Sequence, residues 1–134
     1  MVHKINALIV ANPGRFRDGL QTVVQMMPNI LSVACAADLT AVLPLSPISL
    51  ILLDADLAGL SCWPTRDELQ QNFPLARLLL LVSVQSQEQM ADSLCADAVL
   101  LKGFYNDTLT RTIDSLVGHP PMPASLTHVK RPKL

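Results

Sequence analysis

The sequence predicts an α/β fold in which a parallel sheet is covered by helices on both faces. Five apolar segments have the length of strands, and stretches with the helical spacing of apolar residues alternate with them. Strands that alternate with helices need crossover connections, which are right-handed and place the helices against a parallel sheet. The fold class that follows is α/β.

The predicted strands are short and almost wholly apolar, as expected for strands buried on both faces. They span residues 5–10, 30–34, 48–54, 77–82 and 98–101. The predicted helices span residues 17–27, 38–45, 65–72, 87–94 and 107–117.

Length and composition favour one compact domain followed by a tail. The chain has 134 residues, of which 50% are hydrophobic and 16% charged, so it can bury a substantial core. We expect this domain to span residues 1–118. Residues 119–134 are rich in proline and then basic, which predicts a linker or tail. A solvated end or tether is favoured over an arm for an acidic partner or nucleic acid.

Several function classes are disfavoured by composition. A formal net charge of -1 gives no electrostatic case for direct binding of nucleic acid or an anionic membrane. The apolar runs are shorter than the roughly 20 residues of a membrane span, and the N-terminus leads into a strand, so a cytoplasmic location is expected. Three cysteines without close pairs indicate neither a disulfide framework nor a zinc site. With five glycines and no glycine-rich loop, a bound nucleotide is not expected.

Polar residues stand where the predicted strands end. Asp54 ends the third strand, Asn12 follows the first, Ser83 follows the fourth and Lys102 follows the fifth. In open parallel sheets, ligands bind in the crevice outside the carboxyl ends of the strands. A lone Asp after a strand more often caps the next loop, but four polar strand ends together favour a functional site.

With these strand ends in order, residues 4 to 117 resemble the receiver domain of bacterial two-component response regulators. Segments 10–20 and 95–104 are similar to regulators with a LuxR-type DNA-binding output. The resemblance implies a flavodoxin-like, doubly wound sheet of five parallel strands in the order 2-1-3-4-5. It also implies site positions: Ala11 and Asn12 match the family's acidic pair, Asp54 its phosphoacceptor, Ser83 its Ser or Thr, and Lys102 its lysine.

The departures from the family pattern concern metal binding. Receivers need Mg²⁺ to bring an anionic donor to the anionic Asp, and Mg²⁺ prefers carboxylate oxygens. Here a methyl group, Ala11, and a neutral amide, Asn12, replace the acidic pair. A unit charge about 4 Å from a divalent ion is worth roughly 8 kcal/mol at an effective dielectric of 20. We therefore expect no metal and no cofactor.

Asp56 leaves an alternative open. Residues two apart on an extended segment point to the same side, so the Asp56 carboxylate could replace the missing acids beside Asp54. A solvated loop carboxylate is the favoured interpretation of this residue. An ion pair between Asp54 and Lys102, with hydrogen bonds completed by Asn12 and Ser83, would satisfy the site without a metal.

Three further positions depart from the family. Val99 stands where receivers often carry the aromatic residue that reports phosphorylation. Ala58 and Cys62 stand where the family commonly has Pro and Gly. A switch through Val99 is therefore not expected.

The favoured function is that of a degenerate receiver, not an enzyme, which acts by protein–protein interaction in two-component signal transduction or transcriptional control. The alternative is a working phosphoacceptor, phosphorylated at Asp54 through an atypical Mg²⁺ site that uses Asp56. A flavodoxin-like domain for some other ligand is a third interpretation, without a ligand-binding loop to support it. The resemblance implies a homodimer through the fourth helix, fifth strand and fifth helix, about residues 87–117, with a histidine kinase or an output domain as further partners.

Overall fold

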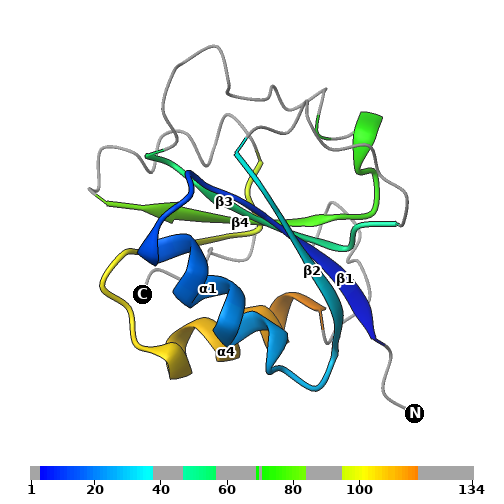
Figure 1. Ribbon diagram of the computed structural model, residues 1–134. Coiled ribbons are helices and arrows are strands. Elements are labelled where there is room, and N and C mark those ends of the chain that lie inside the picture. The colour runs from blue at the N-terminus through cyan, green and yellow to red at the C-terminus, as the bar shows by residue number, and fades with distance from the viewer. Residues whose placement is uncertain (1–3, 38–46, 57–68, 70, 84–94, 118–134) are drawn as a thin grey trace.

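The computed structural model describes residues 4–37, 47–56, 69, 71–83 and 95–117. Their elements are arranged around one sheet, as Figure 1 shows. In chain order they are β1 (Ile5–Val10), α1 (Arg15–Gln25), β2 (Ile30–Ala36), β3 (Leu50–Asp54), β4 (Arg77–Val82), β5 (Ala98–Leu101) and α4 (Asn106–Val117). The expected helices over 38–45 and 87–94 lie outside the described residues, as does most of the one over 65–72.

All five strands form one parallel sheet in the order β2-β1-β3-β4-β5. The predicted fold class and strand order are confirmed. The observed bounds of β1, β4 and β5 agree with the expected ones, whereas β2 extends to Ala36 and β3 begins at Leu50. No helix in the described part of the chain is long and apolar enough to cross a membrane.

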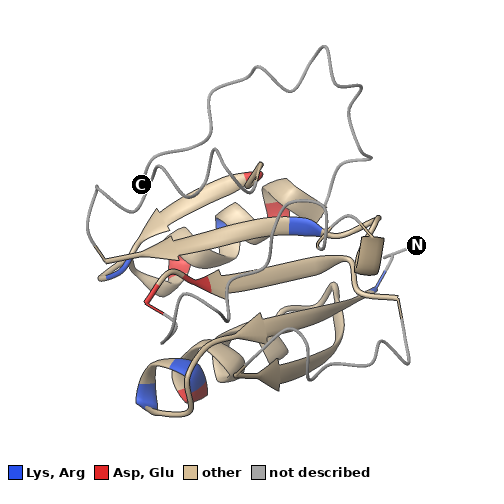
Figure 2. Ribbon diagram, turned by 90° about the horizontal axis from the view of Figure 1, so that it is seen from above, with Lys and Arg blue, Asp and Glu red and all other residues tan. Residues whose placement is uncertain are grey.

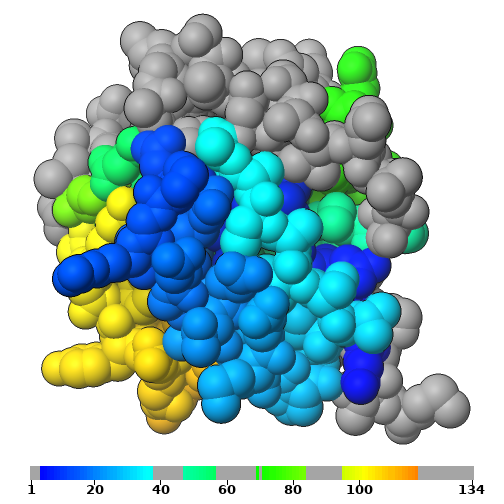
Figure 3. Space-filling view, in the orientation of Figure 1, coloured from blue at the N-terminus to red at the C-terminus, as the bar shows by residue number. Residues whose placement is uncertain are grey.

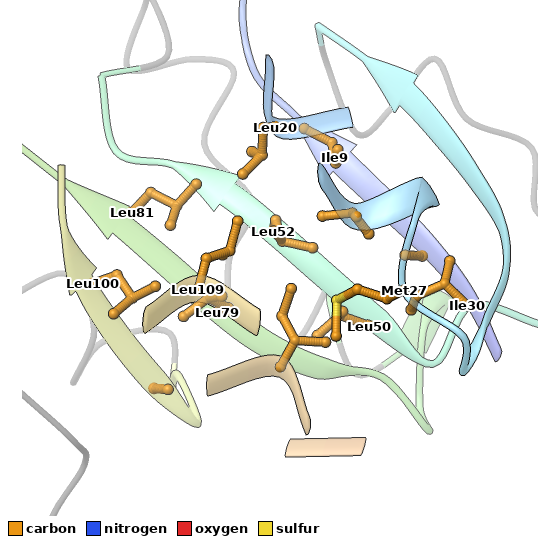
Figure 4. Packing of buried hydrophobic residues seen from close by; sticks show 14 of the residues in the cluster. Ile9, Leu20, Met27, Ile30, Leu50, Leu52, Leu79, Leu81, Leu100 and Leu109 are labelled. Atoms are coloured by element: carbon orange, nitrogen blue, oxygen red, sulfur yellow. The ribbon is translucent and has the colours of Figure 1, made fainter. Parts of the chain in front are cut away.

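The largest apolar cluster lies between the sheet and the helices α1 and α4, as Figure 4 shows. Helical spacing places Leu20 and Val24 of α1 and Leu109 and Ile113 of α4 against the strands. Figure 3 shows the outer surfaces of α1, β2 and α4 next to one another on one face of the molecule. One face of the sheet is therefore covered by the first and last described helices.

The second apolar cluster lies on the other face of the sheet. Strand residues such as Leu80 and Val82 pack there with Leu69 and Phe73. Every residue of β3 is buried, because both faces of this central strand are covered. The unbroken apolar run that ends in Asp54 is thus explained by its position in the sheet.

The pairing of β1 with β2 contains one irregularity. Ile5 pairs with Ile30, but the next residue, Asn6, pairs with Ser32, so Leu31 is an extra residue in β2. The Leu31 side chain is 63% exposed. Ser32 Oγ donates a hydrogen bond to Asn6 Oδ1 at 2.6 Å, across the two strands just after the bulge.

Candidate functional site at the carboxyl edge of the sheet

The carboxyl ends of β3, β4 and β5 bring three of the predicted polar residues to one edge. Figure 2 shows acidic residues where β3 ends and a basic residue where β5 ends. Asp54 is the last residue of β3, while Ser83 and Lys102 directly follow β4 and β5. The Lys102 amide donates to the Val82 carbonyl at 2.7 Å, which extends the parallel pairing to the lysine itself. Sheet pairing therefore fixes where these side chains begin.

A turn directly after β5 leaves the Lys102 side chain at this edge. Gly103 has a φ of 97°, in the left-handed region that glycine adopts without steric cost. No described residue lies within contact of the position that a side chain on Gly103 would occupy, so among these residues it is the backbone angle that favours glycine there.

The ammonium of Lys102 bridges two carboxylates. Its Nζ lies 2.6 Å from Asp54 Oδ1 and 2.8 Å from Asp56 Oδ2. The side chains of Asp54, Lys102 and Asp56 are 8%, 22% and 40% exposed, so the pair with Asp54 is the better shielded from water. The expected ion pair between Asp54 and Lys102 is present.

Asp56 is part of the same hydrogen-bonded group. Its amide N–H donates to Asp54 Oδ1 at 2.9 Å, and its carboxylate accepts a hydrogen bond from the Ser83 hydroxyl. Asp56 is an exposed carboxylate in the turn after β3, as the favoured interpretation expects, but it also contacts Ser83 and Lys102, which that interpretation did not include. We call Asp54, Asp56, Ser83 and Lys102 the carboxylate cluster.

The end of β1 takes no part in the carboxylate cluster. Ala11 is 1% exposed, and its carbonyl accepts a hydrogen bond from Arg17 Nη1 at 3.3 Å. Asn12 is exposed, and its side chain forms no hydrogen bond with any other described residue. The prediction that Asn12 would complete the hydrogen bonds around Asp54 and Lys102 is wrong, since the chain after β1 turns this amide toward solvent.

The aromatic ring of Phe16, which was not predicted to belong to the site, lies against the Lys102 ammonium. The centroid of the Phe16 ring lies 4.5 Å from Lys102 Nζ, within the range of a cation–π contact. Phe16 belongs to the first turn of α1, the helix that follows β1 at this same edge. Phe16 could have been predicted to lie near the site because it is an aromatic residue at the start of a helix that begins at this edge.

The environment of Lys102 favours its charged form. Burial by itself lowers the pKa of the Lys102 ammonium, but hydrogen bonds to Asp54 and Asp56, together with the attraction of both carboxylates, outweigh it. The pKa is therefore raised above the ordinary value of 10.5. The ammonium stays protonated throughout the physiological range and acts as a fixed cation.

The remaining predicted positions have no contact with the cluster that the structure describes. Val99 is 5% exposed and packs in the second apolar cluster, on the face opposite α1 and α4. Ala58 and Cys62 lie outside the described residues.

The carboxylate cluster contains one cation, the Lys102 ammonium, and its members are joined by hydrogen bonds. Its two carboxylates and one ammonium sum to one negative charge when all three are ionised. Among the described residues, no three side chains of His, Cys, Asp or Glu gather closely enough to hold a metal ion together. The oxygen donors of Asp54 and Asp56 that Mg²⁺ would use are in contact with the Lys102 ammonium. In this arrangement both carboxylates are paired with the cation of Lys102.

The sheet order, the helices and the polar edge together define the fold of response regulator receiver domains. A two-component response regulator of the LuxR family from Aurantimonas sp. SI85-9A1 is similar, with a TM-score of 0.69 and 21% identity over 93% of this chain and 94% of that one. The signal receiver domain of an HD domain-containing protein from Pseudomonas fluorescens Pf-5 matches with a TM-score of 0.71 and 17% identity, over 89% and 90% of the two chains.

A third similar structure contains two RcsB dimers bound to two parallel DNAs. It has a TM-score of 0.68 and 16% identity, and the match covers 94% of this chain and 66% of that one. No protein-family model matches the sequence, and no curated protein sequence matches it. At these identities the likeness establishes the fold, and the expected resemblance to receiver domains is confirmed at that level.

Proposed function

We propose that this chain is a degenerate receiver, a protein-interaction module of two-component signal transduction or transcriptional control that works without Mg²⁺-dependent phosphorylation. One observation carries the proposal: the Lys102 ammonium bridges Asp54 and Asp56. The carboxylates at the edge of the sheet are paired with a cation that belongs to the chain. The domain then acts by binding and not by catalysis.

Electrostatics support this proposal in two ways. The positions that match the family's acidic pair hold a buried methyl group, Ala11, and an exposed amide, Asn12. A divalent ion about 4 Å from the Lys102 ammonium would be repelled by roughly 8 kcal/mol at an effective dielectric of 20. To bind at Asp54 it would first have to displace the lysine, and no acid from the end of β1 would compensate.

The partners of such a module are other proteins. We infer a homodimer or a contact with an output domain through a surface that includes β5 and α4, and no direct contact of this domain with nucleic acid. Exposed Leu101 and Tyr105, which are 38% and 81% exposed, lie at the start of this surface. Arg111 and Asp114 are exposed on α4. The RcsB dimers on DNA support dimerisation as a function compatible with this fold.

Sedimentation velocity tests the partner surface. We expect self-association of the wild type to be independent of Mg²⁺ and of a phosphate mimic, and to change in the charge reversals Arg111→Glu and Asp114→Lys without unfolding. Asp18→Lys, on the exposed part of α1, is the matched control. A chain that is monomeric at all concentrations, or dimeric only with the phosphate mimic, would refute this surface.

The second candidate is the working phosphoacceptor, and one contact favours it. Asp56 lies beside Asp54, with its amide bonded to the Asp54 carboxylate and its own carboxylate shared between Ser83 and Lys102. A second carboxylate is therefore close to the residue that matches the family's phosphoacceptor. If Lys102 moved away, Asp54 and Asp56 would be two oxygen ligands for a weak Mg²⁺ site.

Intact-mass spectrometry after incubation with acetyl phosphate separates the two candidates. We expect no added phosphoryl group, with or without millimolar Mg²⁺. The controls are Asp54→Asn, which removes the acceptor, and Asp107→Asn, which removes an exposed carboxylate on α4. A Mg²⁺-dependent gain of one phosphoryl group that is lost in Asp54→Asn and kept in Asp107→Asn would establish the second candidate.

A further inference from the structure

The contact between Phe16 and Lys102 joins two parts of the chain that are far apart in sequence. Phe16 lies in the first turn of α1, and Lys102 directly follows β5. The ring centroid is 4.5 Å from the ammonium nitrogen. Helix α4, which follows β5, packs on the same face of the sheet as α1. The contact therefore connects the start of α1 with the carboxylate cluster.

Among the described residues, two carboxylates and one aromatic ring contact the ammonium, and the ring acts differently from the carboxylates. The Asp54 and Asp56 carboxylates accept hydrogen bonds from the ammonium, with N···O distances of 2.6 and 2.8 Å. The Phe16 ring attracts the charge through its negative face and accepts no strong hydrogen bond. The ring also covers part of the ammonium that water would otherwise reach, and the lysine side chain is only 22% exposed.

We propose that Phe16 is a positioning residue, whose ring holds the Lys102 ammonium in its bridge between Asp54 and Asp56. The inference rests on the proposed function, because it explains how an internal cation stays in the place where a metal would be needed. A four-carbon lysine side chain is flexible and is normally well hydrated. The two carboxylates attract the ammonium, and the face of the Phe16 ring adds an apolar contact that is also electrostatically favourable. Movements at the start of α1 would then be transmitted to the cluster through Lys102.

A double-mutant cycle tests the coupling between ring and ammonium. Denaturant unfolding is measured for the wild type, Phe16→Leu, Lys102→Met and the double variant. Phe16→Leu keeps an apolar side chain, although a smaller one, and removes the ring, so simple packing predicts the same loss in both backgrounds. We expect Phe16→Leu to destabilise the wild type more than it destabilises Lys102→Met. The difference should be roughly two- to fivefold in the unfolding equilibrium constant. Equal losses in both backgrounds would overturn the proposal.

A second measurement does not depend on the stability of Lys102→Met. With ¹⁵N-labelled lysine, NMR reports the exchange of the Lys102 ammonium protons with water. We expect this exchange to accelerate in Phe16→Leu and to stay as in the wild type in Phe16→Tyr, which keeps the ring. Unchanged exchange in Phe16→Leu would refute the positioning role. Lys4, an exposed lysine next to β1, is the internal control.

The experiments distinguish a failure of this inference from a failure of the proposed function. Phosphorylation of Asp54 in the mass-spectrometry experiment would refute the degenerate receiver, whatever the role of Phe16. Equal losses of stability in both backgrounds of the cycle and unchanged proton exchange in Phe16→Leu, with no phosphorylation, would refute the role of Phe16 and leave the degenerate receiver intact.

Discussion

The two halves of the carboxyl edge differ in how completely their polar groups are satisfied. At the ends of β3, β4 and β5, four side chains form the carboxylate cluster. At the end of β1, Ala11 is a buried methyl group, and Asn12 is exposed and bonds to no other described residue. The comparison teaches that carboxylates at one half of an edge need not be left unpaired when the other half supplies no charged group, because a lysine at the end of a neighbouring strand is their counterion.

The largest expected effect is the loss of that counterion. Lys102→Met leaves Asp54, whose side chain is 8% exposed, without its cation. Breaking a buried pair costs about 3 to 5 kcal/mol and an exposed pair about 0 to 1, so we expect a loss of about 3 kcal/mol in the free energy of unfolding. Denaturant melts measure it.

The control for Lys102→Met removes the stranded charge as well. Asp54→Leu combined with Lys102→Met leaves neither charge of the buried pair, and much of the lost stability should return. Small and additive effects of the two changes would show that Asp54 and Lys102 are not coupled in solution.

A smaller effect is expected from the more exposed acid. Asp56→Asn keeps an acceptor for the Ser83 hydroxyl and removes the charge that Lys102 contacts. Because the Asp56 side chain is 40% exposed, we expect a loss of about 1 kcal/mol in thermal or denaturant melts. The matched control is Asp107→Asn, which breaks the exposed pair with Arg111 and should cost less than about 0.5 kcal/mol. Equal costs would mean that the cluster is no better shielded than the surface of α4.

The pH dependence of stability tests the charge on Lys102. Its pKa is raised in the folded chain, so its contribution is fully present below the unfolded value, near 10.5. That contribution is lost as the pH rises through the higher folded value. We expect the free energy of unfolding to fall in this alkaline range, and this part of the fall to be absent in Lys102→Met. Identical alkaline profiles for both chains would contradict the raised pKa.

The smallest effect is expected at the other half of the edge. Asn12 is exposed and bonds to no described residue, so Asn12→Ala should change the free energy of unfolding by less than about 0.5 kcal/mol. Ser83→Ala, which removes a hydrogen bond to Asp56, should cost about 1 kcal/mol. A cost at Asn12 as large as that at Ser83 would mean that the two halves of the edge are equivalent.

Much of the fold was predictable because β1, β3 and β4 are buried on both faces, so that their apolar runs mark them directly in the sequence. The pairing of Asp54 with Lys102 was predictable as well, because both residues stand at the ends of strands that share an edge. The contacts of Asp56 and Asn12 were not, because they depend on how the chain turns after β3 and β1. Pro13 and Gly14 follow Asn12, and no pattern of apolar residues reports the direction of such a turn.

The irregular pairing near the start of β2 bears on how the protein avoids aggregation. β2 and β5 are the outer strands of the sheet, and an exposed outer strand is a template on which another chain can add a strand. β2 carries the bulge at Leu31, and β5 has only four residues. Bulges and short length are two means by which natural sheets make their edges poor templates. Uncontrolled growth from strand to strand is therefore disfavoured at both edges of this sheet.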